Sequence, residues 1–258
     1  EQQLTRFDAE ELLRQKKATR QAMMTGGDGI VDPRVDALKP FSVGARFTSA
    51  DFFPMFDTPF LYGQGWSGAE DNGHARVAVI SRNLNEKLFK GGNSVGREVL
   101  FEGHPLRIVG VLDTWSPQPL FYDVFVGKYD RKEEVLLPFS TSRDLKLDRS
   151  GNMNCFGREI VNDATALNVP CAWIQYWVEL DSAGDAGTFK TYLDNYSDQQ
   201  RAAGRFERPT NTRLRNVMQW MDYRGVVPGD VRLQLWLAFG FLLVCLVNTV
   251  GLLLAKFL

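Results

Sequence analysis

The C-terminal stretch from Leu233 to Ala255 reads LQLWLAFGFLLVCLVNTVGLLLA, which is twenty-three residues without a charged side chain. A helix of this length is about 34 Å long and can cross a hydrocarbon core of about 30 Å. Arg232 and Lys256 flank the run, where their side chains could reach the two membrane surfaces. We therefore predict a transmembrane helix over residues 231–256. The alternative is a buried core helix of a soluble domain.

The chain before this helix has the composition of a water-soluble domain. The whole sequence is 44% hydrophobic and 24% charged, with a formal net charge of -1. About 230 residues suffice for one large domain or two small ones. The near-neutral charge argues against nucleic-acid binding, which needs a concentrated excess of Lys and Arg. Because the sequence opens at Glu1 without a Met or an apolar leader, we interpret it as a soluble domain between membrane segments.

The cysteines indicate which side of the membrane this domain faces. Cys245 lies inside the apolar helix and is interpreted as a small hydrophobic residue. Cys155 and Cys171 are close in sequence, and an even pair in a soluble domain suggests a disulfide and an oxidising compartment. Such a bond would contribute about 3 kcal/mol in the chain-entropy account. The alternative is two unrelated buried thiols. No CxxC motif or His/Cys cluster suggests zinc.

The N-terminal part is predicted to form a helix, a loop and a strand. The helix covers TRFDAEELLRQKKATRQAMM, residues 5–24, with Asp8 and Glu11 as a candidate capping box. The Gly-rich segment from Gly26 to Pro33 is typical of a loop. A strand is expected at Phe41–Thr48.

The clearest alternation of strand and helix patterns comes next. ARVAVIS, residues 75–81, is an apolar run of strand length, and Arg82–Phe89 places its apolar residues on one helical face. Two short strands meet around Glu102–Gly103 as a hairpin, and Glu133–Ser140 gives another strand, which Pro138 ends. The hairpin connections are too short for a doubly wound parallel sheet, so we predict the α+β class.

The last soluble part contains a strand and a long helix. Ala172–Leu180 alternates, with Trp173 and Trp177 on one face, which indicates that both faces of the strand are covered. A helix is expected from Asp181 to about Ala203. The segment NTRLRNVMQWMDYRG, residues 211–225, fits a strand or a short helix.

Three stretches of the sequence also resemble a known protein family. They are FTSADFFPMFDTPFLYGQGWS (47–67), ARVAVISRNLNEKLFKGGNSVGREVLFEGHPLRIVGVLD (75–113) and EEVLLPFST (133–141). In this order they resemble the MacB-like periplasmic core domain, which belongs to FtsX-type permeases of the MacB class of ABC transporters. The closing NTVGLLLAKFL looks like the second of four membrane helices in that family. Cys155 and Cys171 depart from it, since a typical member need not carry them.

The resemblance implies an α+β domain of two subdomains outside the membrane, followed by one transmembrane helix. Residues 1–72 and 170–228 would form a porter-like unit, and residues 73–169 a smaller inserted unit. It also implies a homodimer, or a pairing with a related permease chain, that works with a separate cytoplasmic ATPase. The expected location is the bacterial inner membrane, in contact with lipid and with the main domain in the periplasm. A periplasmic adaptor protein is a further possible partner, and no cofactor is expected.

No motif in the sequence predicts catalysis. GGNSVG lacks the Lys and hydroxyl residue of a phosphate-binding loop, because Arg97 and Glu98 stand at those positions. His74 and His104 lie in or beside turns without a second ligand at metal-binding spacing. GWSG lacks the GxSxG pattern of a nucleophile elbow. We therefore predict that the domain is not an enzyme, with a ligand- or lipoprotein-binding sensor and a membrane-anchored hydrolase as the alternatives.

Asn248, Thr249 and Gly251 are the candidate packing residues of the membrane helix. Polar side chains within a membrane usually face another helix and form hydrogen bonds across it. The alternative for Thr249 is a bond to the carbonyl four residues earlier in its own helix, without any outside partner.

Overall fold

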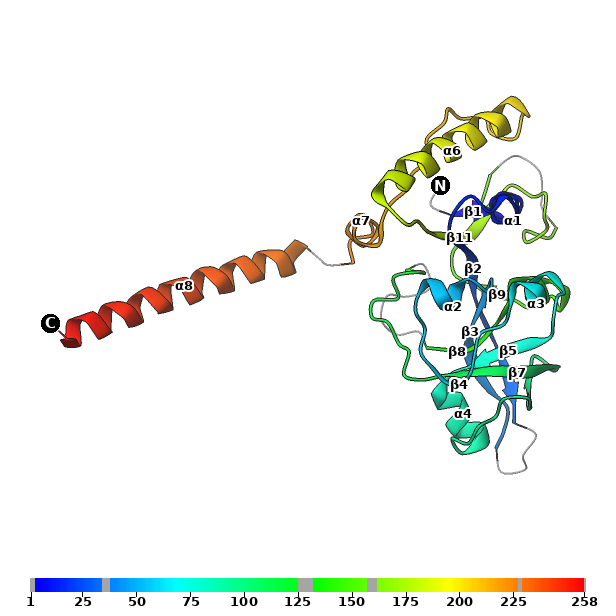
Figure 1. The fold of residues 1–258 in the computed structure, drawn as a ribbon, viewed down its shortest axis with the longest axis horizontal. Coiled ribbons are helices and arrows are strands. Elements are labelled where there is room, and N and C mark those ends of the chain that lie inside the picture. Colours follow the sequence, from blue (N-terminus) through cyan, green and yellow to red (C-terminus); the bar gives the residue numbers. More distant parts are fainter. Residues whose placement is uncertain (1–2, 34–37, 125–131, 157–161, 227–228, 258) are drawn as a thin grey trace. The chain divides into compact units, whose positions relative to one another are not determined.

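The computed structural model describes residues 3–33, 38–124, 132–156, 162–226 and 229–257 (Figure 1). It divides the chain into two units, Glu1–Leu214 and Arg215–Leu258, which we describe separately and call the head and the C-terminal unit.

The strands and helices lie as follows. The strands are β1 (Leu4–Thr5), β2 (Arg20–Asp32), β3 (Phe41–Thr48), β4 (Phe60–Gly63), β5 (Val77–Ile80), β6 (Glu98–Phe101), β7 (His104–Leu112), β8 (Glu133–Pro138), β9 (Arg149–Ser150), β10 (Asn154–Cys155) and β11 (Cys171–Glu179). The helices of the head are α1 (Arg6–Gln15), α2 (Phe52–Met55), α3 (Gly68–Asn72), α4 (Arg82–Phe89), α5 (Phe139–Asp144) and α6 (Ala183–Ala202). The C-terminal unit holds α7 (Val217–Tyr223) and α8 (Gly229–Phe257).

One mixed sheet joins the strands of the described head. Its main order is β1-β11-β2-β3-β8-β5-β7-β4, with β6, β9 and β10 paired at its sides. β3 pairs with β8 and β5 pairs with β7 in parallel, while the other printed pairs are antiparallel. The α+β class is therefore confirmed. The division into residues 1–72 with 170–228 and residues 73–169 stays a prediction.

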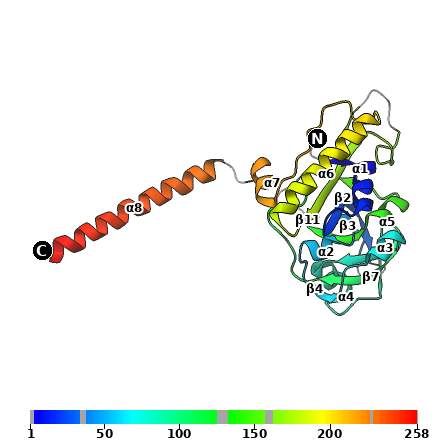
Figure 2. The same cartoon turned by 45° about the horizontal axis from the view of Figure 1, so that its top comes forward.

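Strand β2 is the element that connects the two ends of the sheet. Its first part pairs with β11, and its remaining length pairs with β3 and, at Val31 and Asp32, with β6. Figures 1 and 2 show α6 beside α1 and β11 at one end of the head, with α4 at the other end near β4 and β7. A movement at one end can therefore reach the other through a single continuous strand.

The central strands of this sheet are buried on both faces. Neighbouring residues of β2, Met23 and Met24, belong to two different hydrophobic clusters, and the same is true of Val79 and Ile80 in β5. Because side chains alternate along a strand, the clusters cover opposite faces. Trp173 of β11 is fully buried, so this tryptophan of the predicted face is covered within the head.

The predicted helix over residues 5–24 is too long. Helix α1 ends at Gln15, because Lys16 adopts a left-handed conformation with φ 47° and closes it. The chain then enters β2 at Arg20, where Gln21–Met24 is buried. The N-cap is Thr5 rather than Asp8, since the Thr5 hydroxyl accepts a hydrogen bond from the Asp8 backbone N–H.

The loop prediction for Gly26–Pro33 is also wrong, because β2 continues to Asp32. The glycines are required by packing. A Cβ on Gly27 would lie 2.2 Å from Cζ of Phe47, and one on Gly29 would lie 2.3 Å from Cζ of Phe101. Two aromatic rings lie directly on the strand backbone, so glycine here marks close approach rather than a turn.

The other sequence-based elements agree well with the structure. The strand at Phe41–Thr48 and the helix at Arg82–Phe89 are confirmed with the same bounds. The hairpin is confirmed as well, since Phe101 and His104 pair across Glu102 and Gly103. Of the two alternatives for residues 211–225, the helix is the correct one over Val217–Tyr223.

Candidate functional site

Helix α8 has the length and composition of a membrane span. Within Leu233–Lys256, an 18-residue stretch has a mean hydropathy of 2.5, and none of that stretch is buried within the chain. Trp236 is 71% exposed and Leu252 is 75% exposed. A core helix of a soluble domain would be covered by its own chain, whereas this helix leaves a continuous apolar surface that needs another covering.

The three packing candidates on α8 differ in what they contact. The Thr249 hydroxyl donates to the carbonyl of Cys245 over 2.8 Å, so its hydrogen bond is made within its own helix. Asn248 is exposed, and Gly251 has no atom within 4 Å of the place where a Cβ would stand. Asn248 therefore carries the stronger argument for a partner outside the described chain, because its amide is the larger polar group to satisfy.

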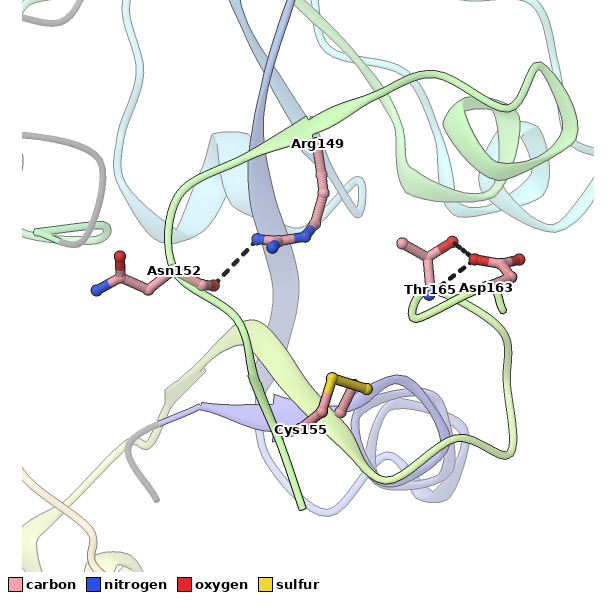
Figure 3. Close-up of a disulfide and its surroundings, with 6 residues drawn as sticks. Arg149, Asn152, Cys155, Asp163 and Thr165 are labelled. Carbon is pink, nitrogen blue, oxygen red and sulfur yellow. Dashed lines mark hydrogen bonds between the residues drawn. A yellow bond between two sulfur atoms is a disulfide. The ribbon is translucent and has the colours of Figure 1, made fainter. Parts of the chain in front are cut away.

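Cys155 and Cys171 form a disulfide in the structure (Figure 3). They face each other across the antiparallel pair β10 and β11, so the bond joins directly opposite residues. Cys171 is fully buried and Cys155 is exposed. The backbone N–H of Phe156 donates to the carbonyl of Pro170 and closes the base of the same loop. The disulfide therefore ties the segment before β11 to the sheet.

A buried charge network lies at the centre of the head. Arg46 of β3 has a side chain with 0% exposure, and it donates over 2.7 Å to Asp123, which is also fully buried. The same guanidinium pairs with Glu133 of β8, whose side chain is 6% exposed. The Gln175 amide of β11 donates to Asp123 over 3.0 Å, and the Tyr122 hydroxyl donates to Glu133 over 2.9 Å.

This network joins three strands to the chain segment that follows β7. Burial and the neighbouring Glu133 carboxylate raise the pKa of the Tyr122 hydroxyl, so Tyr122 remains a neutral donor. No local sequence motif identifies these residues as a network. The available signal was Arg46 itself, since a lone arginine in the apolar strand FSVGARFT needs a buried anion if it faces the core.

The two histidines for which we predicted no metal-binding role lie at the surface or at the start of a strand. The His74 ring contacts Asp144 over 2.6 Å, with both side chains about half exposed, and His104 opens β7. Within the residues that the structure describes, no three His, Cys, Asp or Glu side chains gather as a metal-binding group.

Asp71 of α3 is a partly buried carboxylate with an altered acidity. It accepts hydrogen bonds from the backbone N–H of Ala50 over 2.5 Å and from the Trp66 indole over 2.7 Å. Burial raises its pKa to about 6, although both hydrogen bonds act in the opposite direction. Its contacts join α3 to the start of α2 and to the second hydrophobic cluster, which is a structural role.

We expect the Arg46→Met variant to lose about 3–5 kcal/mol of unfolding free energy, because Asp123 and Glu133 would remain buried without their cation. Arg82→Met is the matched control, since Arg82 pairs with Glu86 and Asp113 at the surface. It should lose less than about 1 kcal/mol. Chemical denaturation followed by tryptophan fluorescence measures both. Equal losses in the two variants would contradict the role of the network.

We expect Asp71 to make stability depend on pH between about 4 and 6. Its folded pKa of about 6 lies above the ordinary value of 3.8, so the folded state binds the proton more tightly. The resulting stabilisation is full below 3.8 and is lost as the pH rises through 6. Thermal melts of the wild type and of Asp71→Asn measure it. The stability difference between them should favour the wild type increasingly as the pH falls, and a constant difference would contradict this assignment.

Comparison with known proteins gives a family for the chain. Residues 2–196 match the family model of the MacB-like periplasmic core domain. A pyoverdine export ATP-binding/permease protein, PvdT of Pseudomonas fluorescens Pf-5, is 30% identical over 121 residues, which is 42% of this chain and 17% of that protein. PvdT of Pseudomonas aeruginosa PAO1 is 26% identical over 94 residues, covering 36% of this chain and 13% of its own length. The chain therefore spans less than a fifth of these curated relatives.

Two solved structures share the fold. The periplasmic region of MacB from Actinobacillus actinomycetemcomitans aligns with a TM-score of 0.51 and 15% identity, covering 78% of this chain and 76% of that one. The extracellular domain of the noncanonic ABC-type transporter YknZ from Gram-positive bacteria aligns with a TM-score of 0.50 and 14% identity, covering 80% and 87%. These structures establish the fold, and the family model covers about three quarters of the sequence. The chain thus belongs to the family of MacB-like periplasmic core domains.

Proposed function

We propose that this chain is the extracytoplasmic head and one membrane helix of an ABC transporter permease. In this proposal, ATP binding and hydrolysis by a cytoplasmic ATPase move the membrane helices, and the head passes that movement to the periplasm. The observation that carries the proposal is the family match over residues 2–196, which is followed by the exposed apolar helix Leu233–Lys256. The printed name of these relatives describes them as export proteins. We propose export for this chain as well, without naming the exported molecule.

The proposed setting is the bacterial inner membrane, with the head in the periplasm. The bond between Cys155 and Cys171 supports an oxidising compartment for the head. We further propose pairing with a second copy or a related permease chain, lipid around α8, and an adaptor protein as an additional periplasmic partner. The relatives' name places ATP-binding and permease parts in one protein, whereas we propose a separate ATPase subunit, as the sequence resemblance implies.

No catalysis is proposed for the head. A sensor would need a deep apolar pocket with converging polar groups. The cavity beside α4, of about 580 Å³, is lined by apolar residues such as Leu88 and Leu100 and by charged ones such as Arg97. The Arg97 guanidinium lies 4.2 Å from the centre of the Phe89 ring, so this charged group already makes a cation–π contact within the chain. We therefore propose force transmission rather than ligand sensing.

The test uses the full-length permease, with its ATPase, in lipid nanodiscs. A donor fluorophore is attached at Asn83→Cys, on the exposed side of α4, in a Cys245→Ser background, and acceptor fluorophores are placed on the lipid headgroups. We expect energy transfer to change when ATP and Mg²⁺ are added, because the head should move relative to the membrane. An ATPase variant that cannot bind ATP is the control. An ATPase that does not co-purify, or energy transfer that ATP leaves constant, would contradict the proposal.

We also propose that Asn248 contributes to helix packing within the membrane. Asn248→Leu should weaken association of the permease in detergent by about 1 kcal/mol, because an interhelical hydrogen bond is lost. Val247→Leu is the control, since it alters a neighbouring exposed position without removing a polar group. Sedimentation equilibrium measures both variants. Unchanged association of Asn248→Leu would remove Asn248 from the packing surface and would leave the proposed function of the head untouched.

A further inference from the structure

Helix α6 is attached to the head by few side chains. Neither hydrophobic cluster of the described head includes a residue of α6, and its buried residues are Phe189, Tyr196 and Ser197. A cavity of about 320 Å³ lies beside its first half, with Lys17 and Asp181 among its lining residues. Next to this cavity the Tyr192 hydroxyl of α6 donates to the Gln15 side chain at the end of α1 over 3.0 Å. Two buried aromatic side chains, Phe189 and Tyr196, supply the apolar part of this attachment, and the polar contacts of α6 supply the rest.

One buried carboxylate gathers two of these polar contacts. Asp8 of α1 is 4% exposed, and it accepts hydrogen bonds from the hydroxyl of Tyr196 and from the guanidinium of Arg205, both over 2.8 Å. The Thr5 hydroxyl donates to its other oxygen over 2.6 Å. The Arg205 guanidinium also lies 3.9 Å from the centre of the Phe7 ring, next to Asp8 in the sequence. Hydrogen bonds of this kind are stronger than neutral ones because one or both groups are charged.

On the sheet side, Asp8 is connected to the strands through Thr5. Thr5 ends β1 and begins α1, and it lies opposite Ala172 of β11. β11 in turn pairs with β2, the strand that runs on to β3 and β6. A force on Asp8 therefore acts directly on the paired strands of the sheet.

On the other side, the chain that leaves α6 returns along it. The Thr210 hydroxyl donates to Asp198, and the Thr212 hydroxyl donates to Asp194. The order of the two contacts shows that this segment runs antiparallel to α6. The same polypeptide continues into Arg215–Leu258, which contains α8. Tension in the chain leading to α8 is thus applied to α6 first.

We propose that the contact of Asp8 with Tyr196 and Arg205 is a latch that holds α6 on the sheet and passes force from the chain leading to α8 into the head. The inference rests on the proposed function, which it deepens by naming the attachment point. When the latch opens, α6 pivots over the cavity beneath its first half and the sheet no longer follows it. In this proposal these residues act by positioning α6.

The first measurement is the distance between spin labels at Asn83→Cys of α4 and Asn195→Cys of α6, in the full-length permease with Cys245→Ser and without nucleotide. The wild type should give one narrow distribution. Asp8→Asn should raise the ratio of detached to attached α6 by at least about tenfold, the change expected from losing one charge-assisted hydrogen bond. The ATP-driven change in energy transfer at Asn83 should fall in parallel.

Tyr196→Phe serves as the second variant, because it keeps the ring and removes only the hydroxyl that donates to Asp8. Arg201→Gln is the matched control on the same helix, since Arg201 pairs only with Asp198 among the described contacts of its side chain. It should leave both readouts unchanged. If Asp8→Asn does not fold, the distance distribution and the energy transfer of Tyr196→Phe test the latch.

The outcomes separate the latch from the proposed function. Narrow distance distributions and a full energy-transfer change in both latch variants would overturn the latch, even if their melting temperatures fall. A wild type whose head does not respond to ATP would overturn the proposed function instead, and the nucleotide-free distance distributions would still test the latch.

Discussion

The close contact of two phenylalanine rings with the backbone of β2 is the constraint on which the head depends. Phe47 lies on Gly27 and Phe101 lies on Gly29, at positions where any side chain would collide with a ring. Strand β2 is extended over thirteen residues and is buried along most of its length, with Asp28 and Ile30 exposed. Because interior packing is dense and deforms little, such a strand carries displacement from one end of the sheet to the other. The proposed transmission of force would depend on this stiffness rather than on a cavity.

The sequence predicted the elements whose signals are local. Phe41–Thr48 and Arg82–Phe89 have the apolar period of a strand and of a helix, and the structure has both with the same bounds. The failures have one physical cause, which is tertiary packing. Residues 20–24 continue a helical pattern but are buried in a sheet, and the glycines of residues 26–33 look like a loop until the covering rings are seen. Long-range contacts of this kind leave no trace in a short window of sequence.

For the site residues too, local signals could be predicted from the sequence and long-range contacts could not. The cysteine pair and the apolar helix were found because each is a compositional signal. Asp8 was assigned to a capping box, and its contacts with Tyr196 and Arg205 span 188 and 197 residues of sequence, beyond any local pattern. Arg46 gave a weak signal as a charge in an apolar strand, but nothing near it in sequence identified Asp123 and Glu133 as its partners.

The two charged clusters of the head differ in a way that suits their positions. Arg46 is buried among strands, and separating it from its carboxylates would leave charges uncompensated in the interior, so that cluster holds the sheet as one body. The Asp8 cluster lies at the edge of the sheet, and the Arg205 side chain is 32% exposed. Water can solvate Arg205 when the contact opens, which lowers the cost of opening. A stiff sheet with a less costly attachment point concentrates movement at the attachment, where the chain leads toward α8.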